Sequence, residues 1–125
     1  MNCPCGSAKS HQDCCLRFIS GQARPVTAEE LMRSRFSAFA SRQTDYLLKT
    51  HWGHQEDSVL KAELERQPVN WLDLEVHESH AGQKKDQRGT VRFTARYLDG
   101  MGAVQAMTEH STFVKAKGCW YYEGC

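Results

Sequence analysis

The chain has 125 residues, enough for one ordinary domain with a modest core. Lysine and arginine total 16, aspartate and glutamate total 15, and the net charge of +1 gives no long-range attraction to nucleic acid or an anionic membrane. No stretch approaches the roughly 18 apolar residues of a membrane span, and no apolar run follows the first residue as in a signal peptide. We therefore expect a cytoplasmic protein with reduced thiols, and neither a membrane nor a nucleic-acid partner.

Cysteines crowd the amino terminus, where four of the six in the chain lie within the first fifteen residues. These four are Cys3, Cys5, Cys14 and Cys15, so two close pairs flank a spacer of eight residues. Four thiolates form the tetrahedral set that structural zinc prefers, and four protein ligands leave no open position for a substrate. A disulfide framework, an iron–sulfur cluster and free or redox-active thiols are the alternatives, and this crowded spacing suits each of them less well. The pattern therefore predicts a structural zinc site.

The spacer between the pairs carries turn-forming and basic residues. Pro4 and Gly6 suit a sharply turned backbone around the first pair. Ser7 can cap a single helical turn over residues 8–13, which would return the second pair to the metal. The basic side chains expected to offset the charge of a four-thiolate zinc centre are Lys9, His11 and Arg17.

Helices are predicted in the first half of the rest of the chain. After a connector at 16–26, Thr27 and Glu30 form a capping box for a helix whose apolar stripe is Leu31, Met32, Phe36 and Phe39. A second helix is expected to start at Thr44 or Asp45. A third is expected within 56–67 and to end at Pro68.

Strands are predicted after Pro68. Residues 70–79 alternate, with Trp71, Asp73, Glu75 and His77 on one face and Leu72, Leu74 and Val76 on the other. Residues 90–98, 103–115 and 119–124 follow as further strands, joined by short turns. The strand at 103–115 places Met107, Glu109, Ser111 and Phe113 on one face and Thr108, His110 and Thr112 on the other. Helices followed by an antiparallel meander indicate an α+β fold.

Three stretches of the sequence resemble two known families. "CPCGSAKSHQDCC" is similar to the SEC-C zinc motif, although Ala8 and Leu16 replace glycines that are frequent there. "LMRSRFSAFASRQTDYLLKTHW" and "HSTFVKAKGCWYYEG" resemble the YchJ family of small bacterial proteins, whose biochemical role is not established. This likeness implies a zinc-binding segment at residues 1–22 and a cone-shaped, nuclear-transport-factor-2-like α+β domain at 23–125.

The resemblance implies two functions of different kinds. The similar segment of the SecA tail binds protein partners, so the first is a docking or adapter module that contacts a protein or the ribosome. The cone would then hold a small apolar molecule or form a homodimer. The second is a dehydratase, isomerase or hydrolase that uses the cone pocket, since related cones host such enzymes.

An enzyme in the cone would need inward-facing acid–base groups, and the sequence offers weak candidates. These are His110 and Glu109 on a strand and Arg35 on a helix, with Arg33, Tyr46 and His51 also within reach of a pocket mouth. Asp73 with His77 is more typical of the polar face of an edge strand. Cys119 is expected to be a buried strand thiol.

Overall fold

The fold consists of helices followed by one sheet, in a computed structural model that describes residues 3–7, 9–66 and 69–124. The helices in these residues are α1 (Cys15–Ile19), α2 (Ala28–Ala40), α3 (Thr44–Lys49) and α4 (Ser58–Glu65). The strands are β1 (Asn70–Ala81), β2 (Arg88–Leu98), β3 (Val104–Ala116) and β4 (Cys119–Gly124). The α+β prediction is confirmed. No helix in the described ranges is long and apolar enough to cross a membrane.

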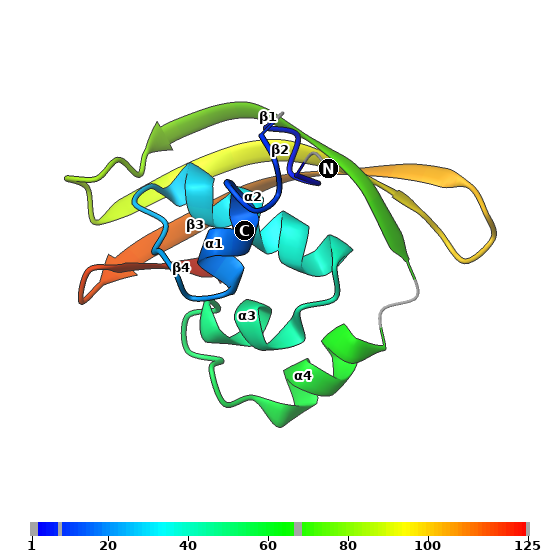
Figure 1. Ribbon diagram of the computed structural model, residues 1–125, viewed down its shortest axis with the longest axis horizontal. Helices are drawn as coiled ribbons and strands as arrows, with labels where there is room; N and C mark the ends of the chain where they lie inside the picture. The colour runs from blue at the N-terminus through cyan, green and yellow to red at the C-terminus, as the bar shows by residue number, and fades with distance from the viewer. Residues whose placement is uncertain (1–2, 8, 67–68, 125) are drawn as a thin grey trace.

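The curved sheet arches over the helices, and α2 lies against its concave face (Figure 1). All neighbouring strands are antiparallel, in the order β1-β2-β3-β4. The β3–β4 hairpin turns through Lys117 and Gly118, whose φ values of 51° and 80° suit a two-residue turn of the type that matches strand twist. β4 is short, so it pairs only with the last residues of β3 (112–116).

The helix α2 begins at the predicted cap. The Thr27 side chain accepts a hydrogen bond from the Glu30 amide at 3.1 Å, and the Glu30 carboxylate accepts one from the Val26 amide at 2.8 Å. Leu31, Met32 and Phe36 are buried, as their helical spacing predicts, and Phe39 is half-buried.

The other helices test the remaining sequence predictions. The predicted start of α3 is confirmed, and α4 lies within the predicted range 56–67. Asp57 caps α4 by accepting from the Leu60 amide at 2.9 Å. Pro68, the predicted end of the third helix, lies outside the described residues. The expected helical turn over 8–13 is wrong for the described part, because residues 11–14 form turns and the helix α1 begins only at Cys15.

The face assignment of β1 needs a correction at its start. Trp71 pairs with Tyr97 and Asp73 with Arg96, so Leu72 is an extra residue in a β-bulge. The bulge reverses the alternation: Trp71 packs against the core, whereas Leu72 is 46% exposed. Trp71 therefore shares the inner side of the sheet with Leu74, not with Asp73.

One main core joins the cysteines to the sheet and α2. It contains the four amino-terminal cysteines with Ala28, Leu31, Met32 and Phe36 of α2, Leu74, Val91, Phe93 and Ala95 of β1 and β2, and Phe113 and Trp120 of β3 and β4. A second cluster of Phe18, Ala38, Tyr46 and Leu47 joins α1, α2 and α3. The division of the chain after residue 22 stays a prediction, since the cysteine side chains share their core with α2.

Candidate metal centre and ligand cavity

Four cysteine sulfurs meet at one end of the main core. The Sγ atoms of Cys3, Cys5, Cys14 and Cys15 all lie within 4.8 Å of one another, and each residue is at most 8% exposed. Cys14 Sγ lies 3.6 Å from Cys5 Sγ and 3.8 Å from Cys15 Sγ. A tetrahedral ion with metal–sulfur bonds of about 2.3 Å would hold its sulfurs about 3.8 Å apart. The four thiols therefore have the spacing of a mononuclear tetrahedral metal site.

Tight backbone turns bring the two pairs together. The Cys3 amide donates to the Lys9 carbonyl at 2.8 Å, and the Gly6 amide donates to the Cys3 carbonyl at 3.2 Å. Gly6 has a φ of 81°, in the left-handed region that glycine adopts without strain. On the other side of the spacer, the Cys14 amide donates to the His11 carbonyl at 3.2 Å, and α1 then carries Cys15 inward.

Polar side chains surround the sulfurs. His11 Nδ1 lies 3.4 Å from Cys3 Sγ, Ser7 Oγ lies 3.1 Å from Cys14 Sγ, and Ser37 Oγ lies 3.3 Å from Cys3 Sγ. Arg33 donates from Nη1 to the Cys5 carbonyl at 2.7 Å. Hydrogen bonds of this kind to the sulfurs and to the backbone beside them orient metal ligands and compensate their charge.

The thiols have strongly unequal acidities in the metal-free protein. A hydrogen bond from the Cys15 thiol lowers the pKa of Cys5 to about 4, against the opposing effect of burial. The same hydrogen bond, reinforced by burial, raises the pKa of Cys15, and burial raises the pKa of Cys14. Among these three thiols, Cys5 therefore gives up its proton most readily, and metal binding to Cys14 and Cys15 must displace their protons.

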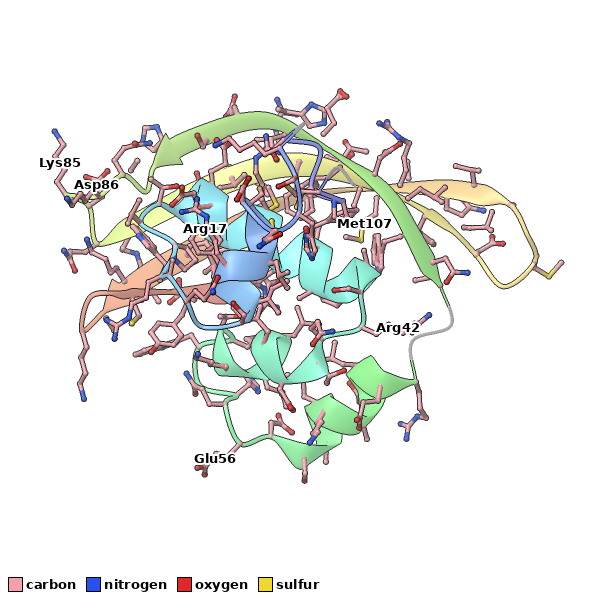
Figure 2. The ribbon with its side chains drawn as sticks, in the orientation of Figure 1. Arg17, Arg42, Glu56, Lys85, Asp86 and Met107 are labelled. Carbon is pink, nitrogen blue, oxygen red and sulfur yellow. The ribbon has the colours of Figure 1, made fainter. Side chains whose placement is uncertain are left out.

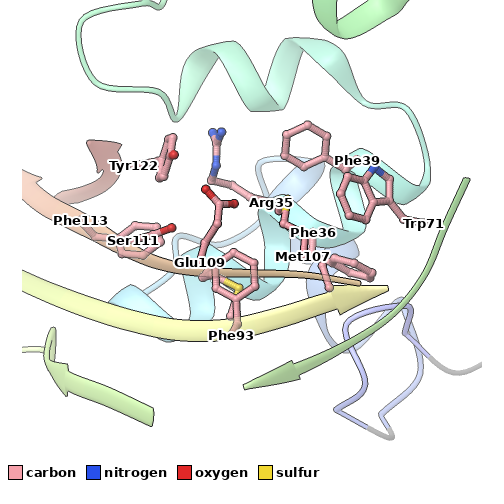
Figure 3. A pocket seen from close by; sticks show the side chains of 12 residues that line it. Arg35, Phe36, Phe39, Trp71, Phe93, Met107, Glu109, Ser111, Phe113 and Tyr122 are labelled. Carbon is pink, nitrogen blue, oxygen red and sulfur yellow. The ribbon is translucent and has the colours of Figure 1, made fainter. Parts of the chain in front are cut away.

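A separate cavity of about 210 Å³ lies between α2 and the concave face of the sheet (Figure 3). Its walls are mostly aromatic and sulfur-containing: Met32, Phe36, Phe39, Trp71, Phe93, Met107, Phe113 and Tyr122, with Ala95. Its polar lining residues are Arg35, Glu109 and Ser111. Met107 lies on the underside of the sheet, as the wider view also shows (Figure 2).

Arg35 is the buried cation of this cavity. It is 8% exposed, and its Nη1 donates to the Leu47 carbonyl at 2.8 Å and to Thr50 Oγ1 at 2.7 Å. The guanidinium also lies over the Tyr122 ring, 4.6 Å from its centroid. Burial lowers the pKa of Arg35 to about 10, which leaves it charged at neutral pH. In Figure 3 the Glu109 carboxylate points toward Arg35.

The structure places only part of the acid–base candidates in the cavity. Glu109 and Arg35 line it, whereas His110 is exposed on the opposite face of β3. Tyr46 is buried in the second cluster, where its hydroxyl lies 2.7 Å from Ser34 Oγ. His51 packs against Tyr122, with their ring centroids 5.0 Å apart.

The remaining candidates lie at the surface or in other contacts. Asp73 accepts a hydrogen bond from Arg96 at 2.6 Å, and His77 Nε2 lies 2.6 Å from Thr94 Oγ1, both on exposed side chains. Arg33 reaches the cysteines instead of a pocket mouth. Cys119 is a free, half-buried thiol.

The sequence did not predict the contacts of three residues at the metal centre and the cavity. Ser37 contacts Cys3, Arg33 holds the Cys5 carbonyl, and Ser111 lines the cavity. The alternation of β3 had placed Ser111 beside Glu109 on one face, which was the available signal. No signal of this kind connects Ser37 to Cys3, because the two are 34 residues apart.

A family model and a relative of similar sequence point to one family. Residues 27–125 match the family described as "YchJ, middle NTF2-like domain". The "UPF0225 protein YchJ" of Shigella dysenteriae is 42% identical over 122 residues, which cover 96% of this chain and 79% of that protein.

Two solved structures share the fold. One is a SEC-C motif-containing protein from Rhodopseudomonas palustris, with a TM-score of 0.84, 38% identity, and coverage of 98% of this chain and 95% of that one. The other is a SEC-C motif-containing protein from Psychrobacter arcticus, with a TM-score of 0.78, 29% identity, and coverage of 98% and 80%. Both likenesses extend over the cysteine cluster and the cone.

Proposed function

This chain belongs to the YchJ family, and we propose that it is a zinc-binding protein whose metal fastens the cysteine segment (residues 3–22) to a ligand-binding cone. The observation that carries the proposal is the set of four buried sulfurs within 4.8 Å of one another. Tetrahedral sites of four sulfurs suit zinc or iron. A cluster of several iron atoms places its cysteines on different irons and needs a wider cage, so the close sulfurs favour a single zinc ion.

The role of this zinc is structural. Four cysteine ligands close the coordination sphere, and their burial keeps water and substrate away from the ion. A segment of about twenty residues has too small a core to fold alone, so metal binding would supply its folding free energy.

Metal analysis tests the zinc assignment. Protein purified under reducing conditions should contain one zinc per chain, and the double variant Cys14→Ser, Cys15→Ser should contain none. Cys119→Ser is the matched control, because this thiol lies outside the cluster and should leave the zinc content unchanged. Iron with visible absorption in place of zinc, or no bound metal, would contradict the assignment.

A docking role for the outer side of the cysteine segment is part of the proposal. Lys9 is exposed there, and Leu16 is an exposed apolar residue (39%) on α1. Co-sedimentation tests a ribosomal partner. The zinc-loaded chain should sediment with purified ribosomes, and Lys9→Glu should reduce the amount that sediments with them. Lys85→Glu, at the tip of the β1–β2 loop (Figure 2), should not. Equal sedimentation of all three proteins would contradict docking through the segment.

The cone is proposed to bind a small molecule in the cavity under the sheet. The enclosing aromatic walls and the few polar groups have the character of a ligand site. An enzymatic version of this function would rest on Glu109 as the acid–base group, since Arg35 lies in the same cavity and His110 does not. Loss of turnover with retained ligand binding in Glu109→Gln would support the enzyme.

A further inference from the structure

The polar end of the cavity selects the chemistry of its ligand. We infer that the cavity binds an uncharged compound of one ring that carries a hydrogen-bond donor and an acceptor at one end, such as an aromatic amide. The inference rests on the proposed ligand-binding function of the cone. It follows from three features of the cavity: an unpartnered hydroxyl, a balanced pair of charges and a small aromatic volume.

Ser111 supplies the unpartnered hydroxyl. The residue is 1% exposed and lines the cavity, yet its side chain makes no hydrogen bond to any part of the chain that the structure describes. Its oxygen is not completely covered by the protein, and the small area that remains accessible faces the cavity. A hydroxyl kept from bulk water in this way is stabilised when a bound molecule hydrogen-bonds to it.

Arg35 and Glu109 supply the balanced charges. The hydrogen bonds of Arg35 within the described residues use Nη1, which leaves its other N–H groups for the cavity. The Glu109 side chain comes from the facing strand and points toward Arg35 (Figure 3). A carboxylate ligand would therefore meet an anion beside the cation, and an ammonium ligand would meet a cation beside the anion. An uncharged amide avoids both repulsions, because its carbonyl accepts from Arg35 or Ser111 and its NH₂ donates to Glu109.

The apolar part of the cavity sets the size of the ligand. Its volume of about 210 Å³ is below the roughly 300–1,000 Å³ of sites for drug-sized molecules. The Trp71 and Phe39 rings, 5.9 Å apart, line the side of the cavity away from Glu109 (Figure 3). Aromatic side chains favour stacked or edge-on contact with a flat ring. One ring with a short polar group fills this space.

Four probes of equal ring size test the inference: benzamide, benzoate, benzylamine and toluene. Each is titrated into the zinc-loaded full chain and followed by the fluorescence of tryptophan and by amide chemical shifts. Benzamide should bind at least about tenfold more tightly than each of the others. Benzoate, benzylamine or toluene as the tightest probe would overturn the inference and leave the ligand site intact. Failure of all four to bind would also overturn the ligand-binding function of the cone.

Variants assign the selectivity to the named residues. Glu109→Gln should raise the affinity for benzoate about tenfold or more, because Arg35 then lacks its counter-charge. Ser111→Ala should weaken benzamide several-fold and leave toluene unchanged. His110→Gln, the neighbour on the outer face, is the matched control and should change none of the four affinities. Unchanged probe preference in folded Glu109→Gln would contradict the charge argument.

Discussion

Arg33 and Arg35 lie two residues apart on α2, yet their side chains serve different parts of the molecule. An α-helix turns by about 100° per residue, so the two point about 200° apart. Arg33 reaches the Cys5 carbonyl, whereas Arg35 enters the cavity and binds Leu47 and Thr50. The sequence predicts that both arginines lie within reach of a pocket mouth. It could not predict their partners, because these come from distant segments that only the tertiary fold brings near.

Removing the Arg33 contact should loosen the cysteine segment. In Arg33→Met the Cys5 carbonyl loses its charged donor, and we expect the free energy of unfolding to fall by about 1.5–3 kcal/mol, as for hydrogen bonds to charged groups. The exposed ion pair with Glu29 contributes little to this. Urea unfolding of the zinc-loaded protein measures the change. Arg24→Met, at an exposed position, is the control, and an equal effect of both variants would contradict the assignment.

His51 should make stability depend on pH. Burial, together with the charge of Arg35, lowers its pKa from the usual 6.5 to about 4. In this pH range the unfolded chain therefore binds a proton that the folded chain does not bind. The free energy of unfolding falls as the pH drops from about 6.5 to about 4. His51→Gln should remove this component. When the pH is lowered from about 7.5 to about 5, the free energy of unfolding should therefore fall less in the variant than in the wild type.

The control for this pH effect is Gln83→Ala. Gln83 is exposed and its side chain does not titrate, so its loss should leave the pH dependence unchanged. Metal release at low pH affects all three proteins and cancels in the comparison. Parallel stability curves for His51→Gln and wild type would contradict the assignment.

Among the elements, β1 contains a feature that the alternation of its sequence does not predict. The strand and its antiparallel partner were predictable from alternation, but the bulge at Leu72 was not. Strict alternation places Leu72 inside and Trp71 outside, and a single extra residue exchanges them. The larger side chain then packs against Phe36 and Tyr97, with ring centroids 5.9 and 5.1 Å away. The gain from burying tryptophan is a tertiary effect that no period in the sequence records.

The β1–β2 connection should tolerate no side chain at Gly82. A Cβ there would lie 2.7 Å from Ala28 Cβ, and the residue has a φ of 71°. The left-handed backbone alone costs a non-glycine residue about 1–2 kcal/mol, and the clash with the start of α2 adds to it. We expect Gly82→Ala to lower the free energy of unfolding by more than about 2 kcal/mol.

Gly100→Ala is the matched control for this glycine. Nothing lies within 4 Å of a Cβ at Gly100, and its φ is not in the left-handed region. Urea unfolding should show a change within about 0.5 kcal/mol for this variant. A Gly82→Ala protein as stable as the control would contradict the close packing between α2 and the connection.

At the scale of the whole molecule, the two sites differ in how far the sequence predicts them. The four cysteines were identified by spacing alone, because their chemistry is local and the other cysteines, Cys119 and Cys125, lie at the far end of the chain. The cavity was expected only from a family likeness, since its residues come from α2 and all four strands. Its polar end depends on Arg35 and Glu109, which are 74 positions apart in the sequence, and only the packing of α2 under the sheet joins them.

Metal removal should affect more than the cysteine segment. Because Cys3, Cys5, Cys14 and Cys15 share the main core with α2 and the sheet, a strong chelator should lower the melting temperature by at least about 10 °C. Amide exchange in α2 and β1 should accelerate together with that of residues 3–22. Faster exchange confined to the cysteine segment would show that the cone folds independently. Added zinc should reverse the change, and magnesium should not.

Through the shared core, the proposed zinc ion would also make the abundance of this protein depend on metal supply. Zinc that binds the folded chain alone stabilises it by mass action, so each tenfold rise in free zinc above the dissociation constant adds about 1.4 kcal/mol to the free energy of unfolding. In a zinc-starved cell the unfolded fraction would rise by the same factor of about ten per decade, and proteases act on that fraction. The four buried sulfurs would then couple the turnover of the entire chain, ligand cavity included, to the concentration of a single ion.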